Sequence, residues 1–167
     1  MAEDFATEID LRFTLNGEAA RARVPAAQHM IDVLRLEFGM TGAHAGCEHG
    51  VCGACTIRVN GQIVRGCLTL AAQAQDAEIW TVEGLSDAGT IADLQAAFVE
   101  RNALQCGFCT PGMLATAADL LDRGGIPSRA EIREHISGNY CRCTGYEAIV
   151  DAIETVARAR AAQETVA

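Results

Sequence analysis

The feature that most constrains the fold of this chain is the position of its eight cysteines. They form two groups of four, with no cysteine between residues 68 and 105. The first group consists of Cys47, Cys52, Cys55 and Cys67. The second group consists of Cys106, Cys109, Cys141 and Cys143. Four thiolates are the ligand set of a tetrahedral zinc ion and also of a 2Fe–2S cluster, so each group has the size of one metal site.

The redox state expected of these thiols follows from the predicted compartment. The N-terminal segment "MAEDFATEID" is acidic and has no apolar centre, so we do not expect it to be a secretory signal. The sequence has no twin-arginine pair and no apolar run long enough to span a bilayer. We therefore expect a cytoplasmic protein, in which cysteines serve as metal ligands more often than they form disulfides.

The first group has the spacing C-x4-C-x2-C, followed after eleven residues by Cys67. This order is typical of plant-type ferredoxins, in which a loop wraps one side of a diiron centre and a separate segment supplies the last thiolate. Glycines in such a loop let the backbone approach the sulfurs and point N–H groups at a negatively charged cluster. These glycines are Gly46, Gly50 and Gly53. Cys52 and Cys55 alone would also fit a zinc knuckle or a redox dithiol, but the complete spacing favours iron and sulfur.

The second group has the spacing C-x2-C, thirty-one residues, then C-x-C, which is unusual for zinc. The segment "QCGFCTPGM" is expected to be a loop that enters a helix, with Thr110 as the cap and Pro111 at the first helical position. The segment "NYCRCTGY" is expected to be a tight loop before the last helix, so that the two loops close on one cluster. His44 and His49 flank the first group, but a loop or surface role is the simpler interpretation because four thiolates already complete that site.

The first half of the chain predicts an α+β fold with a mixed sheet. Residues 9–24 alternate between apolar and polar around Asn16–Gly17, which indicates a β-hairpin, and residues 55–67 repeat this pattern around a second Asn-Gly pair. Residues 29–39 have the spacing of a short helix, and residues 77–85 are expected to form a last strand.

The second half, after an interruption at residues 86–89, predicts helices with short connections, as in a compact four-helix bundle. The predicted helices cover residues 90–104, 111–125, 128–137 and 145–162. Capping boxes are expected at Thr90 with Asp93 and at Ser128 with Glu131. Apolar stripes at helical spacing are expected in the core. They comprise Leu114, Ala118 and Leu121 on one helix and Ile149, Ile153 and Val156 on the last.

The charge composition excludes several classes of function. The formal net charge is −9 and the isoelectric point is about 4.8, so the basic footprint of a nucleic-acid-binding protein is absent. All thirteen positive side chains are arginine, and without lysine neither Schiff-base chemistry nor a phosphate-loop lysine is available.

The segments "GCEHGVCGACTIRVNG", "QCGFCTPGM" and "GNYCRCTGY" resemble the iron–sulfur subunit of molybdenum hydroxylases. This is the family of xanthine dehydrogenase, aldehyde oxidoreductase and aerobic carbon monoxide dehydrogenase, and the resemblance covers all eight cysteines. It implies a plant-ferredoxin-like β-grasp domain over residues 1–84 and a helical 2Fe–2S-binding domain over residues 85–167, a four-helix bundle.

The resemblance also implies the roles of the two cysteine groups. The second group would hold the cluster nearest the molybdopterin, and the first group would hold the cluster that faces the flavin. Gln105 and Cys143 would contact the pterin. Arg142, between two cysteines, would favour the reduced state of its cluster if its side chain lies close, although a plain surface role is equally open.

The chain is too short to contain a molybdenum site and a flavin fold in addition to two clusters. The resemblance therefore implies a large molybdopterin-binding subunit and a medium FAD-binding subunit as partners, assembled as a dimer of heterotrimers. The chain would be a non-catalytic electron-transfer subunit of an oxidoreductase. The alternatives are a free-standing ferredoxin-type carrier, which leaves the helical half without a purpose, and a zinc-binding interaction module. A catalytic-cysteine enzyme is the weakest alternative, because clustered thiols argue against a single nucleophile.

Overall fold

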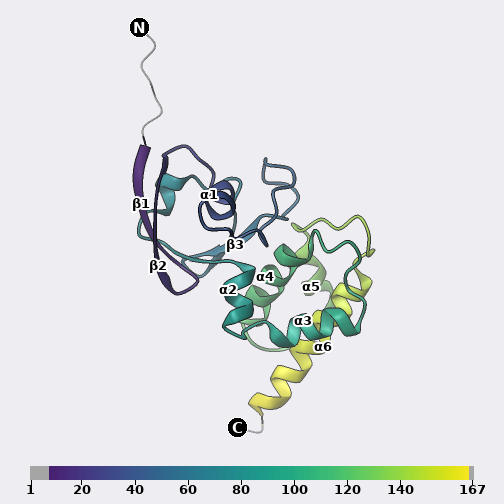
Figure 1. Cartoon of the computed structure of the whole chain (residues 1–167). Coiled ribbons are helices and arrows are strands. Elements are labelled where there is room, and N and C mark those ends of the chain that lie inside the picture. The colour runs from purple at the N-terminus through teal and green to yellow at the C-terminus, as the bar shows by residue number, and fades with distance from the viewer. Residues whose placement is uncertain (1–7, 166–167) are drawn as a thin grey trace.

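A computed structural model describes residues 8–165 of the chain, and places a five-stranded sheet beside a group of helices (Figure 1). The acidic segment at residues 1–10, which predicts the absence of a secretory signal, lies largely outside the described residues. The strands are β1 (Glu8–Leu15), β2 (Glu18–Pro25), β3 (Thr56–Val59), β4 (Gln62–Arg65) and β5 (Glu78–Trp80). The helices are α1 (Met30–Leu36), α2 (Val82–Asp87), α3 (Ala92–Glu100), α4 (Thr110–Leu121), α5 (Arg129–Ile136) and α6 (Glu147–Glu164), with a short 3-10 turn at Ala71–Ala74.

The sheet is mixed, as predicted, with the strand order β2-β1-β5-β3-β4. Strands β1 and β5 are parallel and the other neighbouring strands are antiparallel. Both predicted hairpins are confirmed, and at Asn16–Gly17 and Asn60–Gly61 both turn residues have positive φ, as two-residue hairpin turns require. Helix α1 packs its buried side chains against this sheet.

The predicted strand 77–85 is wrong beyond Trp80, because the chain leaves the sheet there and begins α2. The parallel ladder with β1 ends where Leu15 faces Ile79, since β1 itself ends at the hairpin turn. The side chain of Asn16 then accepts a hydrogen bond from the Thr81 N–H at 2.8 Å and donates one to Thr81 Oγ1 at 3.1 Å. Thr81 is thus bonded to a side chain instead of to the backbone of a neighbouring strand, and β5 ends before it.

The four predicted helices of the second half are present as α3 to α6. The capping box of Ser128 with Glu131 is confirmed. The box at Thr90 is wrong, because Thr90 donates its hydroxyl to the Leu85 carbonyl and Asp93 pairs with Arg160. Helix α4 begins one residue earlier than expected, so Thr110 lies inside the helix instead of capping it.

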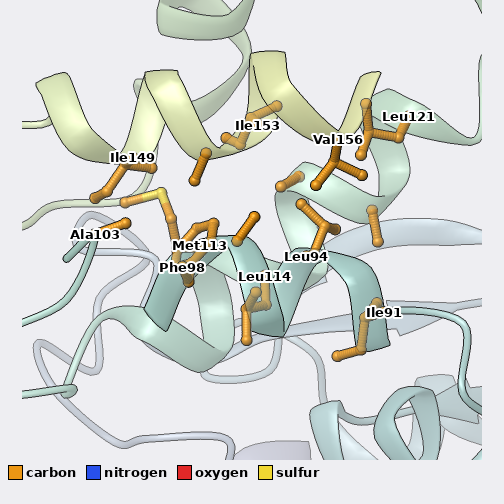
Figure 2. Packing of buried hydrophobic residues seen from close by; sticks show 14 of the residues in the cluster. Ile91, Leu94, Phe98, Ala103, Met113, Leu114, Leu121, Ile149, Ile153 and Val156 are labelled. Atoms are coloured by element: carbon orange, nitrogen blue, oxygen red, sulfur yellow. The ribbon is translucent and has the colours of Figure 1, made fainter. Parts of the chain in front are cut away.

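Buried apolar residues form two clusters, one between the sheet and α1 and the other among the helices. Helix α4 contacts β3 and β4 on one side and α3 and α5 on the other, so it lies between the sheet and the remaining helices (Figure 1). Figure 2 shows Ile149, Ile153 and Val156 of α6 directed at the side chains of α3 and α4, which confirms the predicted stripe. Within the described residues, no helix combines the length and hydropathy needed to cross a bilayer.

Candidate metal centres

The hairpin β3–β4 brings the distant fourth cysteine of the first group to the loop that carries the other three. Cys55 directly precedes β3, and one residue, Gly66, separates the end of β4 from Cys67. Thr56 and Arg65 are paired across the hairpin, and the Gly66 N–H donates to the Cys55 carbonyl at 3.1 Å. Both thiols are therefore buried side by side, each with 2% of the residue exposed. Burial raises the pKa of Cys55 to about 11, and the neighbouring Cys67 thiol adds to the increase.

The other two cysteines of this group lie in the preceding loop and are half-buried. The Cys52 N–H donates to Cys47 Sγ at 3.3 Å, and a Cβ at Gly46 would lie 3.0 Å from Cys52 Sγ. This close approach explains why the loop needs a glycine there. Hydrogen bonds from the backbone N–H groups of Cys52 and His49 lower the pKa of Cys47 to about 6.

The second group is assembled from two loops at one end of the helical half. Cys106 and Cys109 lie between α3 and α4, and Cys141 and Cys143 lie between α5 and α6. The Sγ atoms of Cys106 and Cys143 are 3.6 Å apart on the surface. Cys109 neighbours Cys141, and burial together with that neighbour raises the pKa of Cys109 to about 12.

Cys141 is held by its own loop. Its Sγ accepts hydrogen bonds from the Thr144 N–H at 3.4 Å and the Thr144 hydroxyl at 3.2 Å. Burial opposes ionisation of this thiol, but the Thr144 donors, together with the Cys143 N–H and the Cys109 thiol, outweigh it and the pKa of Cys141 is lowered. The Cys141 N–H donates to Tyr146 Oη at 2.7 Å, which fixes the loop to the start of α6.

In both groups the thiols are therefore arranged in pairs. Among the side chains that the structure describes, no three of the His, Cys, Asp and Glu type converge so as to hold a single ion. A 2Fe–2S cluster divides its four thiolates between two irons, whereas one tetrahedral zinc needs all four at one point. Each group offers four thiols, and N–H groups point at one sulfur in each, Cys47 Sγ in the first and Cys141 Sγ in the second, so the donor set of each group fits a 2Fe–2S cluster.

The two histidines are engaged away from the thiols. His44 Nδ1 is 2.7 Å from the Phe108 carbonyl oxygen, and its ring stacks on that of Phe108 with centroids 4.7 Å apart. His49 Nδ1 contacts the Cys47 carbonyl. Nothing in the sequence pattern predicts that His44 reaches the loop of the second cysteine group.

Gln105 and Cys143 lie together on the surface, where Gln105 Nε2 donates to the Cys143 carbonyl at 3.0 Å. Arg142 is exposed between its two cysteine neighbours. The link that the sequence did not reveal is between the two groups, where the Tyr140 N–H donates to the Cys52 carbonyl at 2.8 Å. The only clue to this hydrogen bond in the sequence is that Tyr140 directly precedes Cys141.

Comparisons with known proteins agree with two separate 2Fe–2S sites, one in each half of the chain. A family described as "2Fe-2S iron-sulfur cluster binding domain" matches residues 35–102, and one described as "[2Fe-2S] binding domain" matches residues 81–154. The gamma subunit of caffeine dehydrogenase from Pseudomonas sp. (strain CBB1) is 51% identical over 152 residues, which cover 87% of this chain and 89% of that subunit.

Two solved structures have the same fold. The crystal structure of quinoline 2-oxidoreductase from Pseudomonas putida 86 superposes with a TM-score of 0.87 at 50% identity, covering 94% of this chain and 97% of that chain. Aldehyde oxidoreductase from Desulfovibrio gigas superposes with a TM-score of 0.86 at 39% identity, covering 93% of this chain but only 17% of the longer chain.

Proposed function

Because this chain belongs to the family of small iron–sulfur subunits of molybdenum hydroxylases, we propose that it carries electrons between the active centres of its partner subunits. The proposal assigns one 2Fe–2S cluster to each group of four cysteines. The observation that carries it is the arrangement of both groups as paired thiols, in loops that are joined by the hydrogen bond from Tyr140 to Cys52. The flavin-side cluster is assigned to Cys47, Cys52, Cys55 and Cys67. The molybdenum-side cluster is assigned to Cys106, Cys109, Cys141 and Cys143.

We further propose that the two halves are separate domains, a plant-ferredoxin-like β-grasp over residues 1–84 and a helical domain over residues 85–167. The mixed sheet packed on α1 supports the first assignment, and the separate apolar cluster of the helices supports the second. Helix α2 begins at Val82 and packs with the helices, so the proposed boundary lies within α2.

Each bound cluster supplies one-electron redox chemistry, and the protein supplies its ligands, its hydrogen bonds and its exposure to water. The N–H donors to Cys47 Sγ and Cys141 Sγ stabilise negative charge on sulfur and so favour the reduced state. Gln105 and Cys143 lie at the surface, where a partner's pterin could approach, and we assign them that contact.

The partners that we propose are a large molybdopterin-binding subunit and a medium FAD-binding subunit, combined as a dimer of heterotrimers in the cytoplasm. Support for larger partners comes from the relative named as the gamma subunit of caffeine dehydrogenase, and from aldehyde oxidoreductase of Desulfovibrio gigas, in which the counterpart of this chain is 17% of a longer polypeptide. Relatives named for caffeine, quinoline and aldehyde oxidation share this unit, so we infer that selection of the substrate occurs in another subunit.

The test is purification of the full chain under anaerobic conditions from its own host. We expect about four irons and as many acid-labile sulfides per chain, and two distinct electron paramagnetic resonance (EPR) signals after reduction. Two larger chains that carry molybdenum and FAD should co-purify. A chain that purifies alone with both clusters would support the free-carrier alternative, and zinc without sulfide would contradict the assignment of the clusters.

A further inference from the structure

Asn139 is a buried polar residue at the junction of the two halves, and only 2% of it is exposed. Its Nδ2 donates to the Gly53 carbonyl at 3.0 Å and to Thr56 Oγ1 at 3.2 Å. Its Oδ1 lies 3.0 Å from the Thr116 hydroxyl of α4, which shares its single proton between this oxygen and the Gly112 carbonyl at 2.9 Å. Burying an amide is costly unless it is hydrogen-bonded. Partners in the first cysteine loop, at the start of β3 and in α4 therefore hold this side chain in one orientation.

The backbone around Asn139 is packed so closely that side chains are excluded. A Cβ at Gly112 would overlap the Gly53 carbonyl oxygen, and a Cβ at Gly53 would overlap the Gly138 carbonyl oxygen. Arg65 reinforces the junction by donating to the Gly138 carbonyl and to Thr56 Oγ1, both at 2.6 Å. Since packed interiors do not deform continuously, three backbone segments in such contact have essentially one arrangement.

Each of these segments also carries cysteines of one of the two groups. Gly53 lies between Cys52 and Cys55, and Asn139 lies two residues before Cys141. Next to Asn139, the Tyr140 N–H donates to the Cys52 carbonyl at 2.8 Å. A route from Cys52 to Cys141 therefore crosses one hydrogen bond and otherwise follows covalent bonds. Electron tunnelling falls steeply with distance and with each gap between bonded segments, so the rate along this route depends on the geometry of the junction.

We propose that Asn139 is a positioning residue for electron transfer between the two clusters. It holds the turn 138–140 against the loop of the first cysteine group, and thereby fixes both the separation of the clusters and the hydrogen bond from Tyr140 to Cys52. This inference rests on the proposed function, because it requires a cluster in each group. It assigns to Asn139 a role that neither cysteine spacing nor family resemblance indicates.

The test is the magnetic interaction between the two reduced clusters in the full chain, isolated with its clusters. Partial reduction gives the g values of each cluster, and full reduction gives the splitting that arises from the interaction of their spins. In Asn139→Ala we expect both sets of g values to stay unchanged while the splitting becomes smaller. Electron equilibration between the clusters after flash photoreduction should slow several-fold.

The matched control is Arg58→Ala. Arg58 of β3 pairs with Asp122 at the end of α4 at 2.7 Å, so this variant also removes a contact between the two halves but leaves the cysteine loops untouched. We expect it to keep the splitting of the unsubstituted chain. An equal change in both variants would show that any loosening of the two halves has this effect, and would overturn a specific role for Asn139.

A second, milder substitution covers the case in which Asn139→Ala does not load its clusters. Thr116→Val removes the donor to Asn139 Oδ1 without changing the volume, and Thr116→Ser retains it. We expect a reduced splitting in Thr116→Val and an unchanged one in Thr116→Ser. A loaded Asn139→Ala or Thr116→Val variant with unchanged splitting overturns the proposal. If the unsubstituted chain lacked two signals, the proposed function would fail, and this inference with it.

Discussion

At the scale of single residues, the local donors around each sulfur differ between the two cysteine groups. In the first group the donors to Cys47 Sγ are the backbone N–H groups of Cys52 and His49, which side-chain substitution does not remove. In the second group the donors to Cys141 Sγ come from Thr144, which has no such role. The Thr144 hydroxyl is therefore a donor that can be removed without replacing a ligand.

Cys106→Ser should affect one cluster only. Cys106 pairs with Cys143, and the thiols of the first group are supplied by other loops. We expect one of the two EPR signals of the reduced protein to be lost or shifted and the other to remain. Loss of both signals in a chain that keeps its circular dichroism would contradict two independent sites.

Arg142→Ala should lower the midpoint potential of the cluster in the helical half. Arg142 is exposed and lies between two proposed ligands in the chain, and removal of a positive charge disfavours the more negative, reduced state. A Coulomb energy of ~1 kcal/mol near water corresponds to about 40 mV for one electron, so a shift of some tens of millivolts is expected in a redox titration. Arg158→Ala, which removes an exposed arginine of α6, is the control and should leave the potential unchanged.

At the scale of elements, the junction depends on α4 having no side chain at Gly112. Helix propensity alone predicts that Gly112→Ala stabilises α4 by about 1 kcal/mol. The clash with the Gly53 carbonyl reverses this sign, since overpacking typically costs about 1–3 kcal/mol. Denaturant unfolding would measure the difference, with Thr110→Ala at the start of α4 as a control expected within about 0.5 kcal/mol of the unsubstituted chain. A more stable Gly112→Ala variant would contradict the described packing.

The elements that were predicted correctly from the sequence are those whose structure depends on residues close in sequence. Two Asn-Gly turns and the capping box at Ser128 depend on residues that are close in sequence, and all three are confirmed. The end of β5 depends instead on Asn16, which is 65 residues away from Thr81, so periodicity wrongly extended the strand. The same limit applies to the candidate site. Spacing predicted the two cysteine groups, but Asn139 and the bond from Tyr140 to Cys52 join segments that are more than 80 residues apart.

At the scale of the whole molecule, a few polar contacts join the sheet to the helices. Arg65→Met would remove two donors at once, one to Gly138 and one to Thr56. A hydrogen bond from a charged group contributes about 1.5–3 kcal/mol, so we expect a loss of that order in the free energy of unfolding. Arg23→Met, which breaks an exposed ion pair with Glu8 in the first hairpin, should cost less than about 1 kcal/mol. Equal losses in both variants would argue against Arg65 as a contact that joins the halves.

The exposure of Cys106 and Cys143 has a practical consequence for anyone handling the chain alone. Dioxygen and chelators reach surface sulfurs first, whereas Cys55 and Cys67 are buried in the apolar cluster of the sheet and α1. Bleaching in air should therefore proceed in two stages, with the helical half losing its colour before the half that contains the sheet. A partner subunit bound over Cys106 and Cys143 would protect these thiols, so both halves would then bleach at similar rates. The time course of bleaching therefore indicates whether the complex has assembled.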